Sequence, residues 1–536
     1  MKHLKNKARY FVIMLLSAIL LLGSCTKNFE AVNTPPEGAT DANTPAVYNA
    51  IVSSLPMSSG QYSVMNAWMY SITQQAITTG GSYPYENANG EVWTNYYSAL
   101  ANYRLLQSRI SAEKDTATMN NLSAMLRTIM AYETFRTTNY FGDMPYFKAG
   151  YAPLNGSDAY KVPFDKQSDI YASILLDLQW AVNNFTENAD QYSIGSSETF
   201  LQGNIPLWIK FANSLRLYVA VTMYDKDNAA AGAQISDAVT KPLLADGEDI
   251  GLWPANIPGL QFQWRNWSFS ANCYLRMGTT MWNLMSSNNN TNGSGIFDPR
   301  CPLFYETNNN GEWAAYDQNP TSSTPTEGGA PYNADNRTLD WTDKGAGCIY
   351  SPVNVYYELD ETTIPELMLT AAQVHLLKAE VYNRGLGVTA DATTAATEYN
   401  AGITASVNMW TGIAFNSTVW VVNKPAAATA TPAQINTLLT NPAVVYNAGS
   451  PTTALSQIYA QLWIDQYRQP WDAWTLLKRT GGKTPMDSGN PGYYTSNFGN
   501  LNRFVYPDAE ASYNYNNWKA ATGGVDLSAS KMWINP

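Results

Sequence analysis

Apolar residues recur at every third or fourth position along much of this chain, which is the spacing of amphipathic helices. The pattern is clearest at Leu122, Met125, Leu126, Ile129 and Met130, which form one stripe. The segments with this period are 121–135, 165–185, 203–227, 361–385, 395–410 and 454–469. The periodicity therefore predicts a mostly α-helical protein.

Residues 240–360 depart from the helical period. They are rich in Gly, Asn, Pro, Thr and Trp, as in TNNNGEWAAYDQNPTSSTPTEGG. Long stretches without their own structure are uncommon in compact domains and usually carry function or are disordered. We therefore predict a loop-rich insertion at 240–360 within a helical scaffold formed by 44–239 and 361–536. Paired helices on both sides of it favour tetratricopeptide-like repeats, although no repeat consensus recurs.

The N-terminus has the pattern of a secretory signal. Four basic residues precede an apolar run that is shorter than the ~20 residues needed to span a bilayer. The motif LGSC at 22–25 then resembles the bacterial lipobox, whose cysteine is acylated. We predict that residues 1–24 are removed, that Cys25 carries the lipid, and that 25–43 tether a single domain at 44–536. The alternative is an ordinary signal followed by an incidental cysteine.

The net negative charge of the chain limits the partners that it can bind. Loss of the signal removes four basic residues, so the formal charge falls from −11 to −15. An acidic surface repels phosphate backbones and anionic lipids. We therefore expect no nucleic-acid partner.

Histidine is too scarce for the common catalytic and metal sites. The chain holds only His3 and His375, and His3 leaves with the signal. His375 has Ala371 and Ala379 four residues away on either side, which predicts a packed apolar face and a core histidine. We therefore expect no Ser-His-Asp or Cys-His arrangement, no zinc site and no cofactor.

Other chemistry stays open at this stage. At most two of the remaining cysteines can pair, among Cys273, Cys301 and Cys348. Loops rich in Asp and Asn can hold calcium without a recognisable motif. Carboxylates are numerous enough for a two-carboxylate glycosidase, but the chain lacks the strand–helix alternation of a barrel hydrolase. We therefore expect no catalytic residues and a non-enzymatic role.

Aromatic residues give a positive indication of function. They make up 13% of the chain against 14% for charged residues, and include 17 Trp and 35 Tyr. That supply exceeds what a soluble core of this size usually uses. Because Trp and Tyr combine apolar faces with polar edges, they suit both sugar rings and protein interfaces. We predict that most rings pack in the core and that a minority contact a ligand.

Seven short motifs follow one another along the chain. They are NYFGDMPY (139–146), KFANSLRLYVAVTM (210–223), FDPR (297–300), PELMLTAAQVHLLKAEVYNRG (365–385), YNAGITAS (399–406), QLWIDQYRQPWDAWTLLKRTG (461–481) and NRFVYPDAEASYN (502–514). Together they resemble the SusD/RagB family of surface lipoproteins, and more closely its SusD-like branch. Each motif alone is weak, but their shared order over nearly the whole chain is specific. One departure is Gln373, which stands where the family usually has Glu.

The resemblance implies a fold and a role. It implies about four tetratricopeptide-like helix pairs, with the irregular region lying over them and carrying the ligand surface. It also implies a cell-surface protein that captures a glycan, or in some members a peptide. Such a protein acts as the lid of its main partner, a SusC-type TonB-dependent transporter. The lipid on Cys25 would then sit in the outer membrane, with the protein facing the cell exterior.

Residues within the motifs are expected to be structural. Gly142 can take a positive φ, and Asp143 can accept backbone N–H bonds in the turn that follows. The sequence Asp298-Pro299-Arg300 predicts a turn with an ion pair or a cap. Buried or half-buried donors to carboxylates or carbonyls are expected at Arg216, Arg479 and Arg503.

Two regions combine aromatic rings with hydrogen-bonding side chains. The first is a Gly/Pro loop before a helix at 79–97, and the second is the insertion. We predict glycan contacts at Tyr83, Tyr85, Asn87, Trp267, Trp313 and Trp341. Trp93, at the start of the helix, is explained equally well as a core residue or as a ligand contact.

Two other roles remain alongside glycan capture. The chain is also compatible with a peptide-binding member of the same family. A structural or adhesive surface lipoprotein is the third possibility, and it would show no saturable binding of soluble ligands.

Overall fold

The computed structural model describes residues 42–79, 87–260, 262, 265, 268, 274–325, 347–482, 498 and 501–536. The chain divides into two units, residues 1–47 and 48–536. In the first unit the described residues are 42–47.

The part of the chain before residue 240 is mainly helical. Its helices are α4 (Thr44–Val52), α5 (Ser59–Val64), α6 (Tyr70–Thr73), α7 (Asn87–Ala112), α8 (Asn120–Phe141), α9 (Ala152–Asn155), α10 (Gln167–Asn184), α11 (Ile205–Met223) and α12 (Asn228–Ala238). A short strand, β1 (Ile77–Thr78), precedes α7. The helices α8, α10 and α11 confirm the predictions made from the apolar period in this part.

Beyond residue 240 the elements become short before long helices return. The elements are β2 (Ile250–Leu252), β3 (Leu275–Arg276), α14 (Thr279–Met285), α15 (Cys301–Phe304), α16 (Tyr356–Leu359), β4 (Glu366–Leu369), α17 (Ala371–Arg384), α18 (Ala392–Asn416), α19 (Pro432–Leu439), α20 (Pro451–Asp465), α21 (Pro470–Thr480), α24 (Asp508–Tyr513) and α25 (Tyr515–Thr522). Strand β1 pairs antiparallel with β3, and β2 pairs antiparallel with β4.

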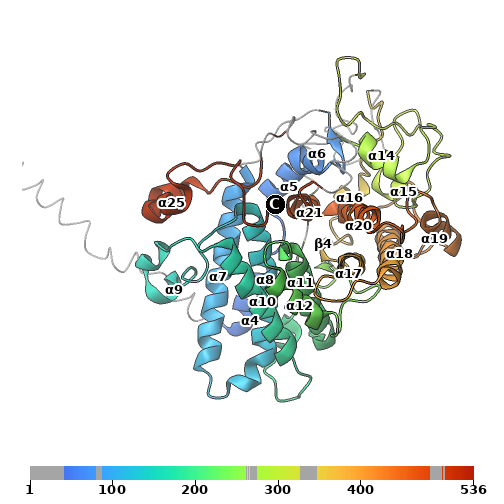
Figure 1. Ribbon diagram of the computed structural model, residues 1–536. Coiled ribbons are helices and arrows are strands. Elements are labelled where there is room, and N and C mark those ends of the chain that lie inside the picture. The colour runs from blue at the N-terminus through green and yellow to red at the C-terminus, as the bar shows by residue number, and fades with distance from the viewer. Residues whose placement is uncertain are drawn as a thin grey trace, which may run out of the picture. The chain divides into compact units, whose positions relative to one another are not determined.

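Long consecutive helices of the larger unit pack in pairs. The pairs are α7 with α8, α10 with α11, α17 with α18, and α20 with α21. Neighbouring pairs also touch, because α8 packs on α10 and α17 packs on α20. Figure 1 shows the first two pairs in blue to green and the last two in orange to red. This arrangement confirms a mostly helical, tetratricopeptide-like scaffold.

Helix α17 begins at Ala371, which makes the prediction of one helix over 361–385 wrong at its start. Residues Glu366–Leu369 form β4 instead and pair with β2. The Thr370 hydroxyl accepts from the Gln373 backbone N–H at 3.0 Å, and the Gln373 side-chain oxygen accepts from the Thr370 N–H at 3.0 Å. This reciprocal capping box fixes the first turn of the helix.

The Asp298-Pro299-Arg300 turn fastens the insertion to the scaffold. The buried Arg300 guanidinium donates to Asp298 at 2.7 and 3.0 Å, which confirms the predicted ion pair. It also donates to Ser406 of α18 at 3.0 Å and to Gln461 of α20 at 2.7 Å. One side chain therefore joins three segments that are far apart in the sequence.

The other predicted arginine roles are also confirmed. Arg479 of α21 donates to both carboxylate oxygens of Glu380 in α17, at 3.0 and 2.7 Å. Arg216 lies 2.6 Å from Asp237. Arg503 donates to Asp526 at 2.5 Å and to the carbonyl oxygen of Phe141 at 2.9 Å.

His375 lies between two carboxylates, and the prediction of a packed apolar face is wrong. Its Nδ1 lies 2.6 Å from Glu398 of α18, and its Nε2 lies 3.2 Å from Asp246. Because the neighbouring helix and a loop supply these groups, the spacing along α17 did not indicate them. The ring links three segments and has partners for both nitrogens.

Most of the tryptophan rings that the structure describes belong to the interior, as predicted. Fully buried examples are Trp208, Trp410, Trp463 and Trp474. Phe304 of the insertion stacks on Tyr467 of the scaffold with ring centroids 4.1 Å apart. A minority of rings is exposed, including Tyr160, Tyr192, Tyr513 and Tyr515.

Cys301 is a buried free thiol, and burial raises the pKa of its thiol group. Cys348 is also buried, and its Sγ donates to the Tyr350 carbonyl oxygen at 3.4 Å. Cys301 and Cys348 are therefore not joined to each other. Cys273 lies outside the described residues.

Candidate ligand-binding site

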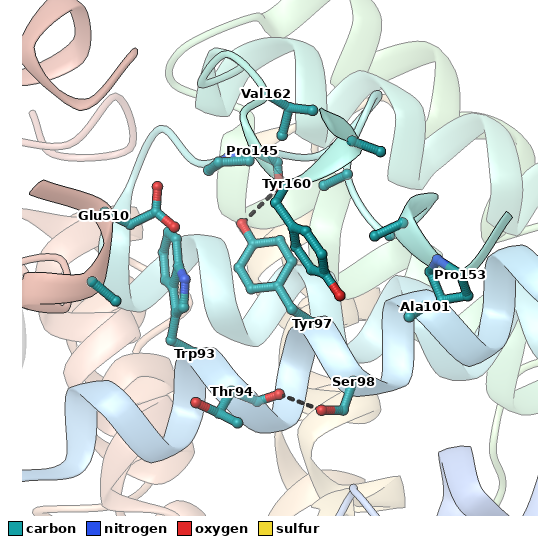
Figure 2. A pocket seen from close by; sticks show the side chains of 15 residues that line it. Trp93, Thr94, Tyr97, Ser98, Ala101, Pro145, Pro153, Tyr160, Val162 and Glu510 are labelled. Atoms are coloured by element: carbon teal, nitrogen blue, oxygen red, sulfur yellow. Dashed lines mark hydrogen bonds between the residues drawn. The ribbon is translucent and has the colours of Figure 1, made fainter. Parts of the chain in front are cut away.

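A cavity of about 490 Å³ opens beside α7, and we call it the α7 cavity. Its volume falls within the ~300–1,000 Å³ that is common for small-molecule sites. Figure 2 shows that its walls come from α7, the segment 145–162 and α24. The lining residues are Trp93, Thr94, Tyr97, Ser98, Ala101, Pro145, Ala149, Gly150, Ala152, Pro153, Ala159, Tyr160, Val162, Ala509 and Glu510.

The first wall is one face of α7. Trp93, Tyr97 and Ala101 are spaced four residues apart, so they lie above one another along the helix. The rings of Trp93 and Tyr97 have centroids 4.8 Å apart. The Tyr97 hydroxyl donates to the Pro145 carbonyl oxygen at 2.7 Å and thereby joins this wall to the next.

The second wall begins at the turn after α8. Gly142 has φ 80°, as predicted from the motif, and it ends the helix. Met144 and Asp165 form an isolated antiparallel bridge. The Asp165 carboxylate accepts from the backbone N–H groups of Tyr146 at 2.8 Å and Phe147 at 2.9 Å. These bonds fix the backbone that follows Pro145.

Gly150 allows the second wall to approach α7 closely. Its φ is 83°, and a Cβ atom there would lie 2.9 Å from Leu100 Cγ and 3.1 Å from the Leu100 carbonyl oxygen. Behind the wall, the Arg104 guanidinium donates to the carbonyl oxygens of Tyr146 at 3.1 Å and Ala149 at 3.4 Å. Both features hold the wall in place.

The third wall is α24, which brings Glu510 to the cavity. Asn514 donates from one side-chain nitrogen to the Glu510 carboxylate at 3.0 Å and to the Val162 carbonyl oxygen at 2.9 Å. Burial raises the pKa of the Glu510 carboxyl, while hydrogen bonds from Asn514 and Trp93 act in the opposite direction. The carboxylate is therefore held in position and is half-buried at the edge of the cavity.

The three rings of the cavity differ in exposure. Trp93 is only 7% exposed and packs edge-on against Phe141 at 4.9 Å and Tyr506 at 5.6 Å. It therefore serves the core and lines the cavity at the same time. Tyr160 is 72% exposed, and Figure 2 shows its ring turned toward the same space as Tyr97. Tyr160 is the ring most accessible to a ligand.

Most of the glycan contacts predicted from the sequence cannot be compared with this cavity. Tyr83, Tyr85, Trp267 and Trp341 lie outside the described residues, and Asn87 is described only through its backbone at the start of α7. Trp313 does not line the cavity. Its half-buried ring stacks on Trp282 with centroids 6.2 Å apart.

Sequence reasoning did not select Tyr97, Tyr160 or Glu510. The spacing of Trp93, Tyr97 and Ala101 was a usable signal for one wall. Glu510 lies within a recognised motif, NRFVYPDAEASYN, but nothing in that motif indicates α7 as its neighbour. Tyr160 is the last residue of the short 3₁₀ helix Ser157–Tyr160 and belongs to none of the seven motifs. Their convergence depends on tertiary packing.

The described residues offer neither a membrane-spanning helix nor a metal cluster. None of the helices in this part of the chain combines the length and the hydropathy needed to cross a bilayer. Over the same residues, His, Cys, Asp and Glu side chains do not gather in threes where a metal ion could be held.

Solved structures with the same fold cover almost the whole chain. A chitin-binding protein shares 21% identity at a TM-score of 0.66, over 92% of this chain and 100% of that chain. A SusD-like protein of Bacteroidetes AC2a shares 19% identity at a TM-score of 0.68, over 92% and 100%. A SusD homologue from Bacteroides fragilis shares 18% identity at a TM-score of 0.67, over 91% and 98%.

Comparison with protein families gives the same result. The SusD-like family, described as "Starch-binding associating with outer membrane", matches residues 40–507. A comparison with curated proteins gives no significant match. Because the family match covers most of the chain and the fold agrees with it, this protein belongs to the SusD-like family, which is associated with the outer membrane.

Proposed function

We propose that this protein captures a glycan at the cell surface and delivers it to a SusC-type TonB-dependent transporter. Acylation of Cys25 would hold it in the outer membrane, and its body would act as the lid of the transporter. The observation that carries the proposal is the α7 cavity, where ring faces and a carboxylate converge.

Sugar binding requires flat apolar faces together with groups that form hydrogen bonds with hydroxyls. Tyr160 and Tyr97 supply faces, and the edge of Trp93 extends them. Glu510 supplies a hydrogen-bond acceptor in the third wall. Because Tyr160 is largely exposed before any ligand arrives, stacking of a sugar ring on it needs no unpacking of the core.

Two names support a glycan rather than a peptide as the ligand. The family is described as starch-binding, and one protein of the same fold is named a chitin-binding protein. The first name describes the family as a whole, and the second belongs to another protein. They favour the class of ligand that the rings of the α7 cavity suit.

The six contacts predicted from the sequence form a second part of the proposal. Of the three contacts predicted in the insertion, Trp313 is the one that the structure describes. Its ring packs on Trp282 and against Gly293. We expect Trp313→Ala to weaken glycan binding and also to lower the melting temperature, because the stack is lost. Unchanged affinity would remove Trp313 from the site.

Calorimetric titration of the protein, purified in detergent, against a panel of oligosaccharides and peptides tests the function. We expect saturable binding of one glycan class without release of smaller sugars. Binding of peptides alone would establish the peptide-binding alternative. Silence across the panel would favour a structural or adhesive role, and release of sugars would contradict a non-enzymatic one.

The transporter proposal is tested separately. Co-purification with the transporter should occur in detergent without added glycan, and Tyr160→Ala should leave it unchanged. If that substitution abolished the complex but not the affinity for free glycan, the ring would belong to the protein interface.

A further inference from the structure

We infer that the α7 cavity selects sugars without negative charge and rejects acidic sugars, with Glu510 as the residue that discriminates. This inference rests on the proposed glycan-binding function and specifies the class of glycan. The inference follows from the charged side chains that line the cavity and from the cationic side chains near it.

The lining contains one carboxylate and no cationic side chain. Among the 15 lining residues, Glu510 is the only Asp or Glu, and there is no Lys, Arg or His. A uronic acid or sulfated sugar in this space would bring a second negative charge beside Glu510. Like charges that share a partly buried site repel each other.

Nearby cations do not compensate for Glu510. Arg104 lies behind the second wall, and its three donor nitrogens point to the carbonyl oxygens of Tyr146 and Ala149 and to the side chain of Gln107. Lys148 and Lys161 are neighbours of lining residues in the sequence, but they are exposed and outside the lining. Among the described residues, the lining of the cavity therefore offers no cationic partner for an anionic group.

The same residues suit uncharged hydroxyls. A carboxylate can accept about four hydrogen bonds, and Asn514 and Trp93 supply two donors. Glu510 therefore keeps acceptor capacity for two neighbouring hydroxyls of a sugar ring. A cationic amino sugar would also be accepted, because its ammonium group pairs with the carboxylate.

Three oligosaccharides of six sugar units each test this preference for uncharged and amino sugars over acidic sugars. They are N-acetylated chitohexaose, its deacetylated amino form and hexagalacturonate. Calorimetry with the protein in detergent should show that the acidic probe binds at least about tenfold more weakly than the better of the other two. Glu510→Gln should reduce this preference severalfold and remove any preference for the amino form. Glu113→Gln, at an exposed glutamate outside the cavity, should leave all three affinities unchanged.

The outcomes separate the inference from the proposed function. Stronger binding of hexagalacturonate, or a preference unaffected by Glu510→Gln, would overturn the inference and leave glycan binding intact. If the preference against the acidic probe survives Glu510→Gln but vanishes in high salt, the acidic surface of the protein causes the preference. That result would also overturn the inference. Absence of binding to every glycan of the wider panel would overturn the proposed function itself. A thermal melt of each variant shows whether it is folded.

Discussion

Glu380 is fully buried and Glu510 is half-buried beside a cavity, and the groups around the two carboxylates differ. Glu380 is fully buried between α17 and α21 and is paired with Arg479 and Arg384, at 2.7 and 2.9 Å. These arginines hold the pKa of its carboxyl below the ordinary value despite burial. No cation of the described segments is paired with Glu510, and burial raises the pKa of its carboxyl.

The difference separates a structural carboxylate from one that is available to a ligand. Around Glu380 the surrounding helices provide donors for both oxygens, so little capacity remains for anything else. Around Glu510 the protein provides an amide and an indole and leaves an open cavity. A carboxylate with incomplete compensation at a cavity is the arrangement expected of a binding group.

The largest effect is expected from removing the structural carboxylate. Glu380→Ala leaves Arg479 and Arg384 without their shared partner, which should lower the free energy of unfolding by about 3–5 kcal/mol. Urea denaturation followed by circular dichroism measures the loss. A decrease below about 1 kcal/mol would show that the cluster is not the clamp between α17 and α21.

A smaller effect is expected at the cavity wall. Gly150→Ala places a Cβ atom against Leu100 at a positive φ, so stability should fall by about 1–3 kcal/mol and glycan affinity should fall with it. Gly156→Ala is the matched control, because its φ is also positive, at 80°, but nothing lies within 4 Å of the added atom. Equal effects of the two substitutions on affinity would contradict the close approach of the wall.

The smallest effect concerns pH. The folded-state pKa of Glu380 is lowered, so its stabilisation is present above its ordinary pKa of 4.5 and is lost as the pH falls through the folded value. The folded-state pKa of Glu510 is raised, so its contribution is present below 4.5 and is lost as the pH rises through the folded value. Both substitutions are compared with wild type by the unfolding free energy from about pH 4 to 7. As the pH rises, the loss of stability caused by Glu380→Gln should grow, whereas the loss caused by Glu510→Gln should shrink. Changes of the same sign would contradict the comparison.

The sequence was informative where structure follows from local spacing. The apolar period located α8, α10, α11 and α18, and the motifs indicated the ion pair of Arg300 and the buried role of Arg479. It was misleading at 361–385, where pairing of Glu366–Leu369 with β2 overrides the helical pattern. The Thr370 and Gln373 capping box was the local signal for the true helix start.

The site was less accessible to sequence reasoning, because its parts are distant in the chain. Trp93 and Tyr97 lie on one helix, whereas Tyr160 and Glu510 reach the cavity through the turn at Gly142 and the Asn514 bond to Val162. No periodicity connects those segments. Likewise, the carboxylates around His375 come from another helix and a loop, so the pattern along α17 did not reveal them.

The central claim, that the α7 cavity holds the glycan, is tested most directly by calorimetry on Tyr160→Ala with the tightest-binding oligosaccharide of the panel. Loss of one exposed ring should weaken binding about two- to tenfold, because ring contacts contribute ~0.5–1.5 kcal/mol and a tenfold change corresponds to ~1.4 kcal/mol. Unfolding free energy should change by less than about 0.5 kcal/mol, as at other exposed positions. Tyr192→Ala, at an exposed tyrosine outside the cavity, should leave affinity unchanged. Wild-type affinity in Tyr160→Ala, with the loss appearing in Tyr192→Ala instead, would contradict the account.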